Sequence, residues 1–156
     1  MTTARKLFGT DGVRGEAGTF LTAELATALG RATTASLEAE RPQVLIVRDT
    51  RESGPTLEAA LAAGIAAAGG DALLGGVLPT PAAAILVKRL GLDLAAVVSA
   101  SHNPFHDNGI KFFDGQGVKL ADEVEAEIEA LIEGAPAAEK AGHVRELNGG
   151  LEDYLR

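Results

Sequence analysis

The sequence predicts the α/β fold class, with one mixed and mostly parallel sheet of four strands. Four short apolar runs read as buried strands, and the first three alternate with two longer segments of helical character. The order strand, helix, strand, helix, strand implies right-handed crossovers and parallel pairing among these three strands. The fourth apolar run follows the third without an intervening helix, and we therefore expect it to lie antiparallel beside a neighbour.

Each predicted element is bounded by residues that start or stop regular structure. Pro55 suits the first turn of a helix, where a backbone N–H would have no partner within the helix. Ser53 or Gly54 is the expected cap of this helix, and Gly69-Gly70 is its expected end. Thr22 is the expected N-cap of the first helix. The predicted strands cover 44–47, 72–77, 94–98 and 109–113. The predicted helices cover about 23–39, Pro55 to Gly69-Gly70, Pro79-Thr80-Pro81 to near Gly91, and about 122–133.

The remaining segments are expected to lack regular structure. Residues 8–15 hold three glycines and suit a tight backbone loop rather than a helix. Residues 134–142 read as a loop or linker, and residues 152–156 as the start of a helix. Residues 1–156 together are long enough for one domain with a hydrophobic core.

Composition excludes several function classes. A formal net charge of -8 argues against nucleic acid as a partner, because nucleic-acid binding needs a basic surface. The chain has no cysteine, which excludes disulfides and thiolate chemistry. No apolar run approaches the roughly 20 residues of a membrane helix, and none follows the N-terminus as in a signal peptide. We therefore expect no membrane partner and take the cytoplasm as the default compartment.

The charges are unevenly distributed along the chain. Acidic residues concentrate between 122 and 133, where we expect a solvated helix face rather than a metal or partner site. Basic residues lie in or beside the predicted loops, namely Arg14, Arg48, Arg51, Lys111 and Lys119. Because the local field decides anion binding, the net negative charge does not exclude a phosphorylated substrate.

The loop Ser99–Asn108 is the strongest candidate for a functional site. It follows the predicted strand 94–98, and polar loops at strand ends are where α/β proteins place chemistry. A serine hydroxyl such as that of Ser101 can accept and donate a phosphoryl group, while Ser99 and Asn103 can hold phosphate oxygens. The alternative is a plain polar turn, since Ser, Asn and Pro are common turn residues.

Three basic residues are candidate phosphate contacts. If 109–113 is a strand, Lys111 faces away from Ile110 and Phe112 and is held near the Ser101 loop, where it could move the proton of a sugar hydroxyl. Arg14 lies in a glycine-rich segment and could donate bidentate hydrogen bonds to phosphate oxygens. Arg51 could do the same, or could pair with a neighbouring acid, Asp49 or Glu52.

Other chemistries of this loop are less well supported. A Ser-His-Asp hydrolase would use Ser101, His102 and Asp107, but adjacent residues point poorly for a nucleophile–base bond and no Gly-x-Ser-x-Gly turn is present. His102 and His106 have helical metal spacing, but Pro104 between them disfavours a helix. A non-catalytic sugar-phosphate-binding module using Arg14, Arg51 and Lys111 remains an alternative.

Several motifs together resemble the α-D-phosphohexomutase family, and the opening motif resembles its phosphoglucosamine mutase branch. The similarity extends over nearly the whole chain, and the most specific stretches are the first and fourth. The matching stretches are Phe8–Gly15, Arg48–Gly54, Pro79–Pro81, Ser99–Asn108, Gly109–Phe113 and Gly117–Leu120.

This resemblance implies a fold, a reaction and a set of site residues. The implied fold is a three-layer α/β/α unit with a four-stranded mixed sheet, corresponding to the first of four domains, with the downstream domains absent from residues 1–156. The implied reaction interconverts glucosamine 6-phosphate and glucosamine 1-phosphate through a 1,6-bisphosphate, with glucose or mannose phosphate as alternative substrates. The implied catalytic residues are Ser101 as a phosphoserine, its neighbour His102, and Lys111 and Arg14 as general acid/base residues.

The resemblance also implies ligands that this chain holds only in part. Mg²⁺ would contact Ser101 through its phosphate, with further ligands from an aspartate-rich loop whose Asp-x-Asp-x-Asp-Arg pattern is absent from these residues. A bisphosphorylated sugar is the implied activator, and a homodimer is one assembly that the longer enzyme can form. We therefore expect the isolated chain to be inactive as a mutase.

Overall fold

A single six-stranded sheet organises the described part of the chain. The computed structural model describes residues 7–9, 12–100, 103–134, 138 and 140–147. The strands are β1 Val13–Glu16, β2 Gln43–Arg48, β3 Asp71–Val77, β4 Leu94–Val98, β5 Asp107–Asp114 and β6 Val144–Glu146. The helices are α1 Ala23–Ala35, α2 Gly54–Ala67, α3 Thr80–Arg89 and α4 Asp122–Leu131.

The sheet is mixed, as the sequence predicts. Its strand order is β1-β5-β4-β2-β3-β6. The strands β4, β2, β3 and β6 run parallel, whereas β5 is antiparallel to both β4 and β1. The antiparallel pairing of β5 with β4 confirms the expectation for the fourth predicted strand.

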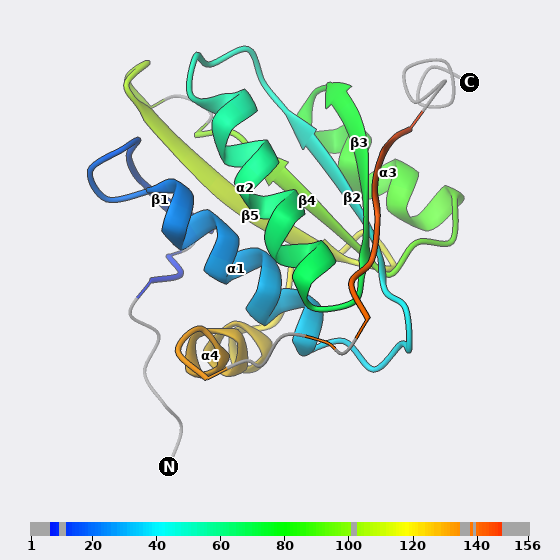
Figure 1. The fold of residues 1–156 in the computed structure, drawn as a ribbon. Coiled ribbons are helices and arrows are strands. Elements are labelled where there is room, and N and C mark those ends of the chain that lie inside the picture. Colours follow the sequence, from blue (N-terminus) through cyan, green and yellow to red (C-terminus); the bar gives the residue numbers. More distant parts are fainter. Residues whose placement is uncertain (1–6, 10–11, 101–102, 135–137, 139, 148–156) are drawn as a thin grey trace.

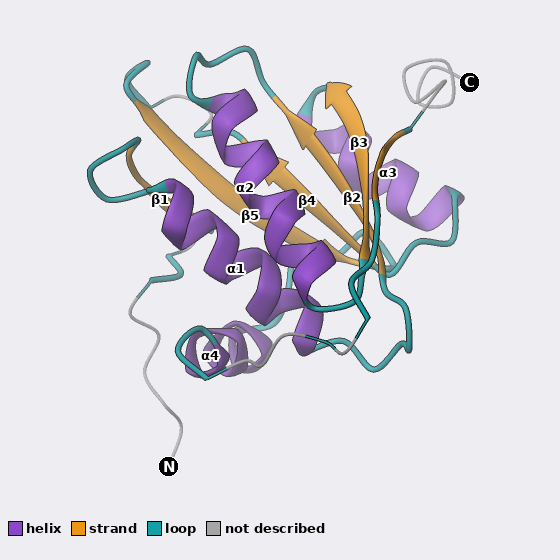
Figure 2. Ribbon diagram, viewed as in Figure 1, coloured by secondary structure: helices purple, strands orange, loops and turns teal. Residues whose placement is uncertain are grey.

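Helices cover both faces of the sheet and make three layers (Figures 1 and 2). The helices α1 and α2 lie side by side on one face, α4 packs beside α1, and α3 lies on the opposite face. Successive residues of a strand point to opposite faces, so the central strands must be apolar at every position. On β2, Val44 and Ile46 join the core under α1 and α2, while Leu45 and Val47 join the core under α3.

The fold class is confirmed, but the predicted count of four strands is too low. The strand β1 falls partly within the segment expected to be a loop, and β6 follows the predicted linker. Every residue of β6 is exposed, so its formation depends on backbone pairing with β3 rather than on an apolar pattern. The strand β5 also begins two residues earlier than predicted, at Asp107, and α1 ends at Ala35 rather than near residue 39.

Other predicted boundaries agree closely with the structure. Thr22 caps α1, its side chain accepting a hydrogen bond from the backbone N–H of Leu25 at 3.1 Å. The Pro79-Thr80-Pro81 segment opens α3, as expected. The predicted helix at 152–156 lies outside the described residues. Within the described part of the chain, no helix is long and apolar enough to cross a membrane.

The contact between α1 and α2 depends on glycine. A Cβ atom added to Gly64 would collide with the backbone carbonyl of Thr27 in α1, and one added to Gly30 would collide with the carbonyl of Leu61 in α2. Backbone atoms cannot move aside as a flexible side chain can. These two glycines therefore set how closely the helices approach each other and the sheet.

We predict that Gly64→Ala lowers the free energy of unfolding by about 1–3 kcal/mol, since the helices must separate to accept the methyl group. Urea unfolding followed by circular dichroism measures the change. Gly134→Ala is the control, because no atom of the described residues lies within 4 Å of a Cβ atom built there. Equal stabilities of the two variants would contradict the close-packing argument.

A carboxylate at the start of β3 ties three segments together. Asp71 accepts hydrogen bonds from Arg41 at 2.9 and 3.0 Å, from the Gln43 side chain at 2.7 Å and from the backbone N–H of His143 at 2.9 Å. The hydrogen bonds from Arg41 hold the pKa of Asp71 well below its ordinary value, against the opposing effect of burial. Asp71 thereby fastens the segment that leads into β6.

We predict that this carboxylate makes stability depend on pH. Its pKa is lower in the folded than in the unfolded state, so its contribution is complete above the ordinary aspartate pKa near ~4 and is lost as pH falls further. The stability difference between the native chain and Asp71→Asn should therefore be largest at neutral pH and shrink in acid. Urea unfolding across pH tests this, with exposed Glu127→Gln as the control. A difference that stays constant with pH would contradict it.

Candidate functional site at the carboxyl ends of the parallel strands

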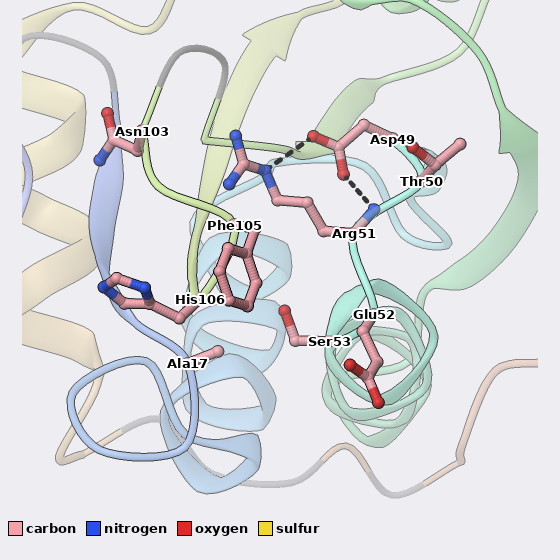
Figure 3. Close-up of a pocket in the computed structure, with 9 residues that line it drawn as sticks. All are labelled: Ala17, Asp49, Thr50, Arg51, Glu52, Ser53, Asn103, Phe105 and His106. Atoms are coloured by element: carbon pink, nitrogen blue, oxygen red, sulfur yellow. Dashed lines mark hydrogen bonds and ion pairs between the residues drawn. The ribbon is translucent and has the colours of Figure 1, made fainter.

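Three loops surround a pocket at the carboxyl ends of β2 and β4 (Figure 3). The pocket has a volume of about 690 Å³. The loop after β2 supplies most of its lining, the loop after β4 supplies a second side, and the turn after β1 supplies Ala17. The lining residues are Ala17, Asp49, Thr50, Arg51, Glu52, Ser53, Asn103, Phe105 and His106.

The pairing of β2 with β4 brings the two main loops together. Arg48 lies opposite Val98 at the end of the parallel register, and the backbone N–H of Asp49 donates to the Val98 carbonyl at 3.1 Å. The next residues, Asp49 and Ser99, are then neighbours, and the Ser99 hydroxyl donates to the Asp49 carboxylate at 2.8 Å. Each loop therefore begins in contact with the other.

Arg51 connects the same carboxylate to the far end of the β4–β5 loop. Its Nε donates to Asp49 Oδ2 at 3.1 Å, and its Nη1 donates to the carbonyl oxygens of Pro104 at 2.7 Å and Asp107 at 3.2 Å. The pairing with Asp49 that the sequence left open is therefore present. A phosphate-binding role of Arg51 stays a prediction.

A buried amide adds a further tie between the loops. Asn108 is fully buried; its Nδ2 donates to the hydroxyl of Ser53 at 2.8 Å, and its Oδ1 accepts from the backbone N–H of Gly109 at 2.9 Å. Ser53 caps α2 by position but makes no side-chain capping bond, which agrees with the use of its hydroxyl here.

Arg14 and Lys111 lie on the same face of the sheet. Arg14 is paired with Gly109 across β1 and β5, and Lys111 is two residues further along β5. The opposite face of β5 carries Ile110 and Phe112, both buried, so the predicted orientation of Lys111 is confirmed. The Lys111 ammonium lies 5.4 Å from the centre of the Phe113 ring.

Asn103 joins Arg14 to the loop. Arg14 Nη1 donates to Asn103 Oδ1 at 3.3 Å, and Asn103 Nδ2 donates to Asp107 at 3.3 Å. Arg14 Nε is buried and has no hydrogen-bond partner among the described residues. The structure thus brings together Arg14, Asn103, Ser99, Arg51 and Lys111 around one end of the sheet, while Ser101 and His102 lie outside the described residues.

Sequence reasoning missed the role of Asp49 and Asn108 in building this site. Asp49 entered only as a partner for Arg51, yet its carboxylate contacts both loops. The signal that could have revealed Asp49 was its position in the sequence. It comes directly after a predicted parallel strand and two residues before an arginine, and the first residue after such a strand lies beside the loop of the adjacent parallel strand. The acidic face of α4 also differs from expectation, because Glu125 is buried against Lys119 at 3.4 Å and Glu129 accepts from the backbone N–H groups of Leu7 and Phe8.

The acidic and histidine side chains of the described residues do not gather into a metal site. No cluster of three or more His, Cys, Asp or Glu side chains that could hold a metal ion occurs within them. His106 lies 3.5 Å from Asp107, an ion pair only when the imidazole is protonated. Asp49 is engaged by Arg51 and Ser99, so these side chains do not form a magnesium site by themselves.

Comparison with known proteins shows a family match over most of the chain. Residues 5–139 match the family model described as phosphoglucomutase/phosphomannomutase, alpha/beta/alpha domain I. The chain is 51% identical to a phosphoglucosamine mutase of Clostridium perfringens over 96% of its length, and 50% identical to one of Bordetella avium over 97%. It spans only 35% and 36% of these two relatives.

Solved structures agree with the sequence relatives. A phosphoglucomutase/phosphomannomutase family protein from Burkholderia thailandensis has a TM-score of 0.84 and 30% identity, and covers 96% of this chain. A putative phosphomannomutase from Thermus thermophilus has a TM-score of 0.80 and 31% identity over the same share. This chain covers 34% of each of those proteins. The sheet, its two helical layers and the family match agree, and the chain belongs to the phosphoglucomutase/phosphomannomutase family, of which it contains the α/β/α domain I.

Proposed function

We propose that this chain is the phosphoserine-bearing domain of a mutase that interconverts glucosamine 6-phosphate and glucosamine 1-phosphate. The observation that carries the proposal is the loop containing Ser101, which is anchored at the carboxyl edge of the sheet with Arg14 and Lys111 beside it. The choice of glucosamine rests on identities of about 50% to proteins named phosphoglucosamine mutase. Identity to the two solved family members described above is lower, at 30% and 31%.

The proposed reaction is two phosphoryl transfers through one bisphosphate. In the first, the bond between phosphorus and Ser101 Oγ breaks while a free sugar hydroxyl forms a bond to phosphorus, giving the 1,6-bisphosphate. The sugar then reorients, and its other phosphoryl group transfers to Ser101 Oγ. The proton released by the sugar hydroxyl in the first transfer is returned to the departing sugar oxygen in the second, so protons and phosphoryl groups balance over the cycle.

Arg14 and Lys111 suit the charge and proton requirements of these transfers. Phosphoryl transfer depends chiefly on positioning and on stabilising negative oxygens. Arg14 has a buried Nε without a partner among the described residues, which leaves donor capacity for a phosphate oxygen. Lys111 is half-buried on a strand, where its ammonium is held in a limited range of positions, and we assign it to proton movement. His102 would help to position the phosphate or the substrate hydroxyl.

This chain would supply only part of the ligand set of a magnesium ion. The metal would contact the phosphate on Ser101 and stabilise its negative charge, but the described side chains hold no metal cluster of their own. Its remaining ligands would come from elsewhere in the longer polypeptide, consistent with the chain covering about a third of its relatives. The bisphosphorylated sugar would restore a Ser101 that has lost its phosphoryl group.

We predict that Ser101→Ala in the full-length protein lowers mutase turnover by roughly 10³-fold or more, because no acceptor oxygen remains for the phosphoryl group. A coupled assay from glucosamine 6-phosphate measures turnover, and mass spectrometry maps the phosphoryl group. The control is Ser36→Ala, at the end of α1, where the hydroxyl bonds only to the Thr33 carbonyl among described residues. Unchanged turnover in Ser101→Ala would show that another group carries the phosphoryl.

The substrate assignment has its own test in the same full-length protein. We expect kcat/KM for glucosamine 6-phosphate to exceed that for glucose 6-phosphate and mannose 6-phosphate. A preference for glucose 6-phosphate or mannose 6-phosphate would support the mutase reaction but assign the protein to another branch of its family. Absence of turnover with all three, together with an unphosphorylated Ser101, would favour a sugar-phosphate-binding module.

We also predict that the isolated 156-residue chain has no measurable mutase activity while remaining folded. The bisphosphate must be retained while it reorients, and this domain supplies one side of the required site. Circular dichroism verifies folding, and the coupled assay measures turnover. Robust turnover by the isolated chain would contradict the prediction and show that this domain alone completes the site.

A further inference from the structure

One acid–arginine pair holds both ends of the loop that contains Ser101. At the start of the loop, the Ser99 hydroxyl donates to Asp49 Oδ2 at 2.8 Å. At its end, Arg51 Nη1 donates to the carbonyl oxygens of Pro104 and Asp107 at 2.7 and 3.2 Å. The pair is closed internally by Arg51 Nε to Asp49 Oδ2 at 3.1 Å and by the Arg51 backbone N–H to Asp49 Oδ1 at 3.1 Å.

The Asp49–Arg51 pair, which we call the anchor, is itself fixed by its surroundings. The Arg51 side chain is only 11% exposed, and Asp49 continues from β2 with its backbone N–H bonded to β4. Figure 3 shows the Arg51 side chain extending from the Asp49 loop toward the segment that carries Asn103 and Phe105. Among the described residues of the loop, the backbone hydrogen bonds within it include Asn103 N–H to the Ala100 carbonyl and Asp107 N–H to the Pro104 carbonyl, both at 3.0 Å. Without the anchor, its ends would be held mainly by the strands that flank it.

We propose that Asp49 and Arg51 are positioning residues for phosphoryl transfer, setting the place from which Ser101 reacts. The inference rests on the proposed function of Ser101. Transfer requires the donor oxygen, the phosphorus and the acceptor oxygen to lie nearly in line, and a displacement of about 1 Å can cost roughly 10²-fold in rate. An anchor that joins both ends of a short loop limits such displacement.

An arginine is required for this arrangement. Its planar guanidinium directs several N–H groups at fixed angles, so one side chain reaches a carboxylate and two carbonyl oxygens together. A lysine at the same place keeps the charge but presents a single nitrogen. Arg51→Lys is therefore a substitution that weakens the anchor while preserving the local charge.

The same chain provides a matched control. Arg41 and Asp71 form a second arginine–carboxylate pair with contacts of 2.9 and 3.0 Å, at the amino end of β3 and therefore at the opposite end of the strands. Arg41→Lys makes the same chemical change in a similar pair. Both variants are expected to lose some thermal stability, so stability alone does not identify positioning.

The test compares Arg51→Lys and Arg41→Lys with the native full-length protein by steady-state kinetics and backbone hydrogen exchange. We expect Arg51→Lys to lower kcat by about tenfold or more, with KM for glucosamine 6-phosphate changed less than about threefold. Exchange of the Ser99, Asn103 and Asp107 amides should accelerate, while the amides of β2 do not. Arg41→Lys should leave kcat and these loop amides unchanged. If Arg51→Lys does not fold, Asp49→Asn weakens the same anchor from the other partner.

Each outcome separates the possibilities. A raised KM with unchanged kcat would overturn the proposal and make Arg51 a substrate ligand, and a lowered kcat with unchanged loop exchange would make it a direct contact of the reacting phosphate. Unchanged kinetics and unchanged exchange would also overturn it. If the native protein shows no mutase turnover but loop exchange still accelerates in Arg51→Lys, the anchor is real and the proposed function is what fails.

Discussion

The parallel pairing of β2 with β4 is the interaction on which the site depends. Its last registered pair, Arg48 with Val98, is followed by a backbone hydrogen bond from Asp49 to the Val98 carbonyl. Parallel strands end at the same edge of a sheet, so their loops emerge next to each other. Everything that follows, including the Asp49 contact to Ser99 and the reach of Arg51 to Pro104, needs that shared edge.

Packing on both faces keeps this edge in place. The strands β2 and β4 are buried on the side of α1 and α2 and on the side of α3, so a slip of either strand by one residue would move the side chains fitted to one core into the other. The glycine contact between α1 and α2 brings these helices close to each other above the first core. The cores therefore fix the strand ends from which these loops begin.

The antiparallel strand β5 completes the site from the other side. It returns beside β4 without a crossover, and it pairs with β1 so that Arg14 lies opposite Gly109. The absence of a side chain at Gly109 leaves room for Arg14, whose Cγ would crowd a Cβ atom there at 2.8 Å. Residues separated by almost a hundred positions in the sequence therefore lie on one face, with Lys111 two residues along the same strand.

Patterns of apolar residues and helix signals were sufficient to predict the central strands, four helices and the orientation of Lys111. Such patterns report local backbone preference and burial, and both are encoded by neighbouring residues. They could not predict β1 and β6. The first contains a glycine and forms by pairing with β5, and the second is fully exposed and forms by pairing with β3 and through the Asp71 contact to His143. Their formation depends on partners far away in the chain.

The same division applies to the candidate site. The sequence alone determined the α/β class, the loop Ser99–Asn108 at a strand end and the chemical types of its side chains, because each is a property of a short segment. The tertiary structure decided the partners: Arg51 with Asp49 and the far end of the loop, Arg14 with Asn103, and Glu125 with Lys119 instead of solvent. Those pairings depend on strand order and register, which arise from the packing of the whole sheet rather than from any one stretch of residues.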